Sequence, residues 1–304
     1  KKKMIEMNKK VEYKDISIAF ALEKVEEKKY LIPSLQRKYV WKEAQIYSLL
    51  DSIMQSYPFG TFLFWDIKEH EKDILNSNKF YEFLKVYDNS GNGSGKEYDI
   101  KKRRFKRLTC VIDGQQRLTS LYVAFWGEMQ SRDRRGAVIS KNMYIDINYE
   151  INKDSQEKYK FRFLSKDEVE KSYKDIIEKK VIDKDSNIWI KLGDVSNKDY
   201  MLTKEEFNSE AANFRTERSK RNKEKIFVGN QIDCIKNCLI GINADIAENI
   251  LSDHNRIDNW QEVLILLFHK THIDSPISYY SIFDKKLENI IEIFIRQNSA
   301  GTPL

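Results

Sequence analysis

Proline, glycine and cysteine are all scarce in this sequence. Four prolines and 11 glycines among 304 residues leave little material for long linkers. The three cysteines, Cys110, Cys234 and Cys238, are odd in number and stand in apolar or helical contexts, so they predict no disulfide framework. This cysteine pattern favours a reducing compartment.

Long apolar runs are also missing. The densest run, VLILLF at residues 263–268, is far shorter than the roughly 18 apolar residues that mark a membrane-spanning helix. The basic residues at the start of the sequence, KKKMIEMNKK, have no apolar segment after them, which argues against a secretory signal. We therefore expect a cytoplasmic protein without a membrane partner.

Charge, in contrast, is abundant and clustered. The formal net charge is +6, and two stretches concentrate the basic residues. Phosphate backbones favour such patches because each contact releases condensed counterions. Both stretches are therefore candidate DNA contacts, while a solvated loop and a solvated helix face are the alternatives. The first stretch consists of Lys101, Lys102, Arg103, Arg104, Lys106 and Arg107, and the second covers residues 215–225.

Apolar periodicity divides the chain into two parts with a boundary near residue 165. Strand signals become rare after that point, so we expect an α+β protein with a mixed α/β core at residues 1–165 and a mostly helical region at 166–304. The polar turn at the end of the sequence, NSAGTPL, suggests one piece of a longer protein. The pattern predicts helices over 16–26, 43–55, 115–126, most of 165–273 and 287–294, and strands over 61–67, 108–112, 143–147 and 159–164.

The strongest functional signal is LTCVIDGQQRLTSLYVAFWG, at residues 108–127. A short apolar strand leads through DGQQR directly into a helix. The start of a helix attracts anions, because it offers free N–H groups and the positive end of the helix dipole. Gly114 lets a ligand approach the backbone, and Arg117 can clamp two phosphate oxygens. Gln115 and Gln116 add neutral donors and acceptors.

Asp113 does not fit a simple phosphate cradle, because a carboxylate repels anions. A Mg²⁺ ion would reconcile the two, since this metal prefers hard oxygen ligands. The alternative is purely structural: Asp113 caps the helix, and Arg117 pairs with a neighbouring carboxylate.

Three stretches resemble, in the same order, the N-terminal domain of the GmrSD-type modification-dependent restriction proteins. They are IPSLQRKYVW at 32–41 with the following helix and YPFGTFLFW, VIDGQQRLTSL at 111–121, and IFIRQNSAGTPL at 293–304. The resemblance implies a ParB/sulfiredoxin-like core, whose comparable strand-to-helix motif holds nucleotide phosphates. It also implies a domain that binds, and in some members hydrolyses, nucleoside triphosphates while sensing modified DNA in phage defence.

The resemblance also implies roles for individual residues. It carries over residues 113–117 as the nucleotide or catalytic motif, and among them we expect Asp113, Gln116 and Arg117 to be catalytic, with Asp113 holding the metal on the argument given above. Ala300 stands where the family more often has a second glycine. The nucleotide-binding residues that the resemblance implies are Gln36, Arg37, Gly114, Gln115, Arg117, Arg296, Asn298, Ser299, Gly301 and Thr302.

The nuclease of this family usually lies in a C-terminal HNH-type domain. None of the four histidines in this sequence stands in a His-Asn-His arrangement. We therefore expect cleavage to require an HNH-type nuclease domain or subunit outside this chain.

Three functions remain open at this point. The chain could be an NTPase that senses DNA with the help of Mg²⁺ and a nucleoside triphosphate of unknown base. It could be a non-catalytic module that grips DNA through residues 101–107, with Trp41 stacked on a base or packed in the core, and with nucleotide as a switch. A Mg²⁺-dependent nuclease using the DGQQR pocket is least favoured, because no carboxylates cluster for two metals. The sequence leaves a homodimer open.

Weaker signals favour structural roles. GNGSGKE, at 91–97, lacks the spacing of a P-loop and predicts a loop. His269 with His272 and Cys234 with Cys238 have helical spacing but no further ligands nearby in sequence. We expect the two cysteines to fill a helix core rather than to bind zinc.

Overall fold

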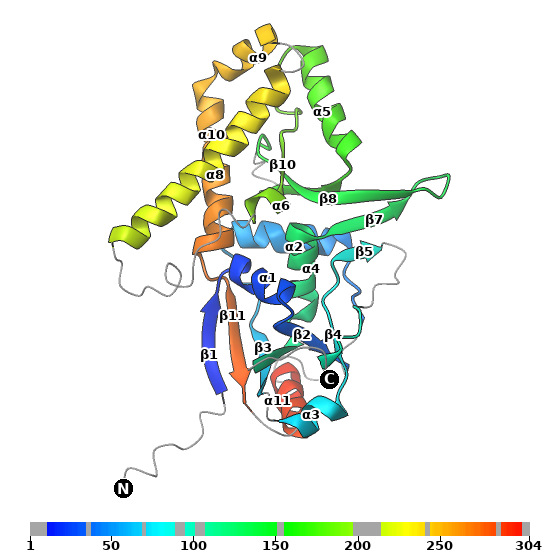
Figure 1. Cartoon of the computed structure of the whole chain (residues 1–304). Coiled ribbons are helices and arrows are strands. Elements are labelled where there is room, and N and C mark those ends of the chain that lie inside the picture. The colour runs from blue at the N-terminus through cyan, green and yellow to red at the C-terminus, as the bar shows by residue number, and fades with distance from the viewer. Residues whose placement is uncertain are drawn as a thin grey trace.

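The computed structural model describes residues 11–34, 38–68, 71–88, 95–100, 107–150, 155–196, 214–240, 244–283 and 287–299. Over these ranges the chain is an α+β protein with two sheets and a helical part at one end (Figure 1). Within them, no helix combines the length and the apolar content needed to cross a membrane.

The first sheet contains six strands in the order β1-β11-β3-β6-β2-β4. β11 is antiparallel to β1 and parallel to β3, so a strand from the C-terminal part of the chain completes this sheet. The antiparallel pair β3 and β6 has a register shift between Leu63 and Phe64, opposite the end of β6. The strands are β1 (Val11–Ile16), β2 (Tyr30–Pro33), β3 (Phe62–Lys68), β4 (Phe80–Tyr81), β6 (Arg107–Asp113) and β11 (Ile277–Ile282).

Helices cover both faces of this sheet, which explains why β3 and β6 are almost continuously apolar. Phe64 and Val111 point to the larger core, under α1 (Ile18–Glu26), α2 (Glu43–Met54) and α4 (Gln115–Trp126). Alternate residues of the strands point to the smaller core on the other face. There Trp65 and Cys110 pack with Ile290 of α11 (Leu287–Ser299) and with side chains of α3 (Lys72–Ser77).

The second sheet is built around the long strand β8. Its first half pairs with β7, and its second half pairs with β9 and β10 on opposite edges. The strands predicted over 143–147 and 159–164 are confirmed, and they pair with each other as the antiparallel strands β8 and β9. β7 was not predicted. The strands are β5 (Val86–Asp88), β7 (Glu128–Arg132), β8 (Val138–Asp146), β9 (Lys160–Leu164) and β10 (Trp189–Lys191).

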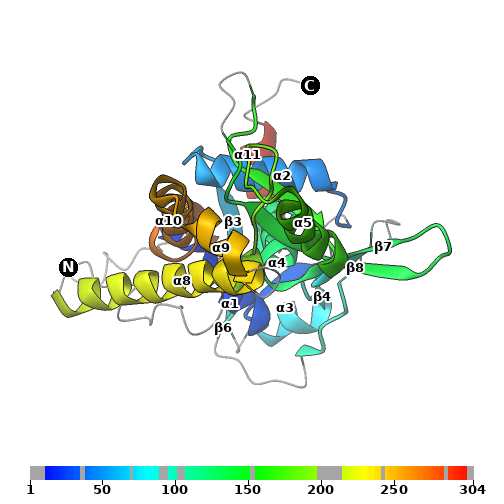
Figure 2. The same cartoon turned by 90° about the horizontal axis from the view of Figure 1, so that it is seen from above.

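Helices dominate the chain between β9 and β11, as predicted. Ser165 begins the first of them with a reciprocal capping box to Glu168. Figure 2 shows that α8 extends well beyond the rest of the described chain. These elements are α5 (Lys166–Lys179), α6 (Leu192–Val195), α8 (Phe214–Ile240), α9 (Ala244–Leu251), α10 (His254–Phe268) and the π-helical turn η4 (His269–Ile273).

Two local predictions are wrong. Cys234 and Cys238 do not fill a helix core but are exposed on α8, because this helix turns the apolar row of Val228, Ile232, Ile235 and Leu239 inward. The last helix also continues to Ser299 rather than ending at residue 294. The helix therefore includes Asn298 and Ser299, the first two residues of NSAGTPL, which the sequence predicted as a turn.

His272 joins the π-helical turn η4 to α6. Its imidazole is almost fully buried, and Nε2 lies 2.8 Å from the carbonyl oxygen of Val195. Because a carbonyl only accepts, Nε2 carries the proton and donates it. Nδ1 is buried and has no hydrogen-bond partner among the described residues. Burial lowers the pKa of His272 from its ordinary value to about 4.

We predict that acid weakens the fold through His272. In the unfolded chain this residue takes up a proton near pH 6.5, whereas in the folded chain it stays neutral down to about pH 4. The free energy of unfolding should therefore fall by about 2 kcal/mol between pH 6.5 and pH 5. Urea titrations at the two pH values would measure this difference. His272→Gln keeps a donor for Val195 and should flatten the pH dependence; an unchanged slope in that variant would contradict the assignment.

Candidate functional site

The junction between β6 and α4 has the form that the sequence predicts. β6 ends at Asp113, α4 begins at Gln115, and Gly114 between them has φ +88°. A Cβ on Gly114 would overlap the ring of Phe62, so both the backbone conformation and the available space require glycine. Gly114, not Asp113, is the N-cap residue of α4, which corrects the alternative with Asp113 in that position.

The guanidinium of Arg117 is bound to the protein on several sides. It donates to the carbonyl oxygens of Phe59 at 2.6 Å and Thr61 at 3.0 Å, and it pairs with Oδ2 of Asp113 at 3.2 Å. Its Cζ also lies 4.5 Å from the centre of the Phe62 ring. Only 16% of the side chain is exposed. The pairing of Arg117 with a neighbouring carboxylate, which the sequence left open, is therefore present.

Gly60 makes room for this arrangement. Its φ is +90°, and a Cβ there would collide with the guanidinium of Arg117. Burial lowers the pKa of Arg117, and the carboxylate of Asp113 partly opposes that effect. Arginine nevertheless stays protonated in proteins, so the junction holds a buried positive charge. The turn that follows α2 is thereby fastened to the first turn of α4.

Gln116 fastens a second segment to the same helix turn. Its side chain is buried; Oε1 accepts from the backbone N–H of Val40 at 2.9 Å, and Nε2 donates to the carbonyl of Lys38 at 3.0 Å. Both ends of the amide are therefore bound to the loop that leads into α2. Gln36 and Arg37, which come immediately before this loop in sequence, lie outside the described residues.

Asp113 carries the carboxylate that is available to a ligand at this junction. Its side chain is 40% exposed, and only Oδ2 is engaged by Arg117 in the bonds described above. No other acid stands in the first turn of α4, and no group of three or more metal-ligating side chains occurs in the described ranges. Mg²⁺ commonly binds one or two carboxylates together with substrate phosphates and waters. The donor set at Asp113 fits a metal ion delivered with a nucleotide.

Gln115 is also buried at the start of α4. The junction therefore brings together Asp113, Gly114, Gln115, Gln116 and Arg117, with the loop 38–40 and the turn 59–61 beside them. Sequence reasoning missed the roles of Phe59, Gly60 and Thr61, although YPFGT belongs to the first of the three resembling stretches. The signal that could have identified this turn is Gly60, which stands directly before the predicted strand 61–67 within that stretch.

The predicted DNA contacts are only partly described. Arg107 lies 3.7 Å from the buried Asp66 and packs over the ring of Phe283. Asp66 also accepts from the hydroxyls of Thr109 at 2.5 Å and Ser281 at 2.6 Å, which joins three neighbouring strands. Arg107 thus has a structural partner, although about half of its side chain is exposed. Lys101, Lys102, Arg103, Arg104 and Lys106 lie outside the described residues.

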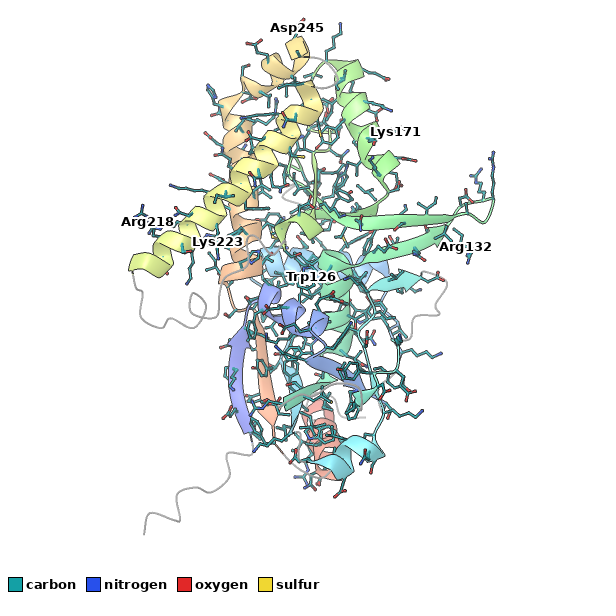
Figure 3. All side chains as sticks on the ribbon, in the orientation of Figure 1. Trp126, Arg132, Lys171, Arg218, Lys223 and Asp245 are labelled. Carbon is teal, nitrogen blue, oxygen red and sulfur yellow. The ribbon has the colours of Figure 1, made fainter. Side chains whose placement is uncertain are left out.

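Trp41 is partly buried against the larger core, in agreement with the packing alternative. The second basic stretch forms the first part of α8, where Arg218, Arg221 and Lys225 are exposed at helical spacing. Figure 3 shows Arg218 near the free end of α8, whereas Lys223 lies closer to η4, where its neighbour Glu224 contacts His269.

The late stretch of the resemblance belongs to α11. Arg296 is exposed and pairs with Glu292 one turn earlier on the same helix. α11 packs on the face of the first sheet opposite to α4. Asn298 and Ser299 end this helix, and their side chains are outside the described ones, as are Gly301 and Thr302 altogether.

Two cavities lie away from the junction. One, of about 640 Å³, is at the opposite end of α4 and is lined by Trp126, Asn142 and Asp194, among others. The other, of about 930 Å³, lies between the loop after β8 and α10, beside Asn148 and Arg256. Neither is lined by the DGQQR residues.

Comparison with known proteins connects these features. Residues 19–304 match the family model of the GmrSD restriction endonuclease, N-terminal domain. A stretch of 105 residues is also 29% identical to Uncharacterized protein MJ0686 of Methanocaldococcus jannaschii. That stretch covers 34% of this chain but only 16% of the relative. Because the family match includes the β6–α4 junction, both elements that it clamps and nearly all of the chain, this chain belongs to the family of GmrSD restriction endonuclease N-terminal domains.

Proposed function

We propose that the chain binds a nucleoside triphosphate together with Mg²⁺ at the β6–α4 junction and hydrolyses it, as the DNA-sensing part of a restriction system. The observation that carries this proposal is the pairing of two features. α4 begins at a glycine without a side-chain cap, and Arg117 fixes the half-exposed carboxylate of Asp113 beside it. Membership of a restriction endonuclease family supports DNA as the partner.

The anionic phosphates would lie at the start of α4. The helix dipole places about half a positive charge there, and backbone N–H groups of the first turn point toward the ligand. Gly114 brings no side chain that would block the approach. Gln116 holds the loop that follows Gln36 and Arg37, the pair that the resemblance assigns to the same nucleotide. Arg296, Asn298, Ser299, Gly301 and Thr302 remain proposed contacts on that basis alone.

Asp113 would hold the metal ion through the carboxylate oxygen that Arg117 leaves open. Bound Mg²⁺ supplies neutralisation of the charge on the phosphates. In hydrolysis, water forms a new bond to the γ-phosphorus while the bond to the bridging oxygen breaks, which yields a nucleoside diphosphate and phosphate. The protein contributes mainly position and fixed charge to such a reaction.

Arg117 acts in this scheme first as a positioning residue. Its three hydrogen bonds orient Asp113 and the turn 59–61. A guanidinium has five N–H donors, so donors remain for the direct phosphate contact expected from the sequence. Gln116 has a comparable role through the loop 38–40, because both ends of its amide are bonded to that loop.

A non-catalytic nucleotide switch is the second candidate, and one observation favours it. Gln116 and Arg117 are largely committed to the protein, which leaves Asp113 as the chemically available side chain among the three proposed catalytic residues. A junction of this kind can bind a nucleotide, fix the attached loop and turn, and release them when the nucleotide leaves.

We predict that Asp113→Asn abolishes hydrolysis without unfolding the junction. The amide oxygen can still accept from Arg117, but the negative charge that would hold the metal is gone. Phosphate release from ATP, GTP, CTP and UTP with Mg²⁺ should fall by about 100-fold or more for the nucleotide that the wild type uses. Asp167→Asn, an exposed change of the same kind on α5, is the matched control. Wild-type turnover by Asp113→Asn would overturn the catalytic role. Nucleotide binding without phosphate release by the wild type would select the switch.

We predict that Arg117→Ala weakens both the fold and nucleotide binding. The carbonyls of Phe59 and Thr61 lose their donor, which should lower the free energy of unfolding by about 3 kcal/mol. Calorimetric titration of the folded variant should show at least tenfold weaker nucleotide affinity, roughly what loss of one charged contact costs.

Arg162→Ala is the matched control for Arg117→Ala. Arg162 on β9 also pairs with an acid, Glu157, and packs over a ring, that of Tyr47. Its removal should affect stability but leave nucleotide affinity unchanged. Equal nucleotide affinity in wild type and folded Arg117→Ala would exclude the junction as the binding site.

A further inference from the structure

The antiparallel pair β7–β8 projects from the described chain as a two-stranded ribbon. Its register joins Met129 to Lys141 and continues outward to Arg132 opposite Val138. Figures 1 and 2 both show the ribbon extending beyond the neighbouring elements, on the side away from the free end of α8. Residues 132–138 are all exposed, including Val138 at 54%. A two-stranded ribbon without a buried face gains little from folding alone.

The tip of the ribbon is a turn whose backbone is held by the carboxylate of Asp133. Oδ1 of Asp133 accepts from the backbone N–H groups of Arg135 and Ala137, each at 2.8 Å. The backbone of Asp133 also bonds to Ala137 and Gly136, and Gly136 has the positive φ that the turn needs. Arg132 donates to the carbonyl of Gly136 at 3.2 Å. The carboxylate therefore stabilises the turn, and its single negative charge leaves the three arginines of the tip in excess.

Three arginines crowd this tip, and Figure 3 shows Arg132 on the projecting part of the ribbon. Arg134 and Arg135 are exposed and have no ion pair or side-chain hydrogen bond within the described chain. Along one face of the ribbon, Gln130 stands opposite Ser140 in register, and both side chains donate to the carboxylate of Glu128 near the base of the ribbon. The ribbon thus combines a positive tip with small polar groups along one face.

We propose that this ribbon binds double-stranded DNA by inserting its tip into a groove. The major groove is about 12 Å wide and admits a two-stranded β-ribbon. The outer end of the ribbon, residues 132–138, is exposed and can contact both walls of a groove, and arginine forks suit phosphate oxygens and the edge of guanine. A flat protein partner would use only one face. The inference rests on DNA being the partner in the proposed function, but not on nucleotide hydrolysis.

The test compares two double variants of the full chain that each remove two positive charges. Arg134→Ala/Arg135→Ala changes the tip, where neither side chain has a partner to lose. Lys171→Ala/Lys174→Ala changes exposed positions of α5 and is the control. Fluorescence anisotropy with a labelled 20-base-pair duplex, over a range of salt concentrations, gives the affinity and its salt dependence. A single strand of the same sequence forms the second arm.

We expect the tip variant to bind the duplex about tenfold more weakly and to lose about two units of the salt slope, while the lysine control stays close to wild type. Equal loss in both variants, no loss in the tip variant, or equal effects on the single strand would overturn insertion of the ribbon into a groove. Phosphate release without DNA should be unchanged in the tip variant. Asp113→Asn separates the proposals, because it removes hydrolysis and leaves ribbon-dependent DNA binding in place.

Discussion

The hydrogen bonds of one guanidinium hold the candidate site together. Arg117 joins the junction between β6 and α4 to the turn before β3, which lies 56 to 58 positions earlier in the sequence. Removing a charged group from water is costly, and the two carbonyls, the carboxylate and the Phe62 ring offset that cost. Gly60 and Gly114 follow from the same constraint, because a side chain at either position would overlap Arg117 or Phe62.

The constraint also explains why the site depends on distant parts of the chain. The turn 59–61 is placed by β3, whose neighbours in the sheet are β6 and the late strand β11. Asp66 connects these three strands through Thr109 and Ser281, so the buried carboxylate helps to hold the strands in register. α11 then covers the opposite face of the sheet. Residues from both ends of the sequence therefore support the position of Asp113.

Periodicity and local chemistry were enough to predict part of this arrangement. The spacing of Leu118, Leu121, Tyr122 and Phe125 placed α4 correctly, and the apolar run before Asp113 gave β6. The contacts of Gln116 with Lys38 and Val40 could not be predicted, because they join residues more than 70 positions apart. The sequence left open that Arg117 pairs with a neighbouring carboxylate. Its bonds to the carbonyls of Phe59 and Thr61 could not be predicted, because they depend on the positive φ of Gly60.

Other failures have equally physical reasons. EMQSR, the sequence of β7, lacks the apolar alternation of a half-buried strand, since most of the ribbon has no core to face. Cys234 and Cys238 share a helical spacing, but a long helix can turn either of two adjacent rows inward. The larger side chains of the neighbouring row decide the choice, because they bury more apolar surface.

α4 provides a direct physical connection between the two proposed binding sites. Its first turn forms the nucleotide junction, and β7 begins two residues after its last turn. Hydrogen bonds hold the segment that leaves α4: the backbone N–H of Glu128 donates to the carbonyl of Lys85, and the side chain of Asn142 donates to the carbonyl of Gly127. A 12-residue helix spans about 18 Å and transmits displacement along its axis better than a loop would. If nucleotide binding shifts α4 between two positions, the ribbon must shift with it, and nucleotide then changes the affinity of the ribbon for DNA. By linkage, DNA bound to the ribbon changes the affinity of the junction for nucleotide by the same factor. The ribbon and the junction would then be coupled through one helix, without a separate moving domain.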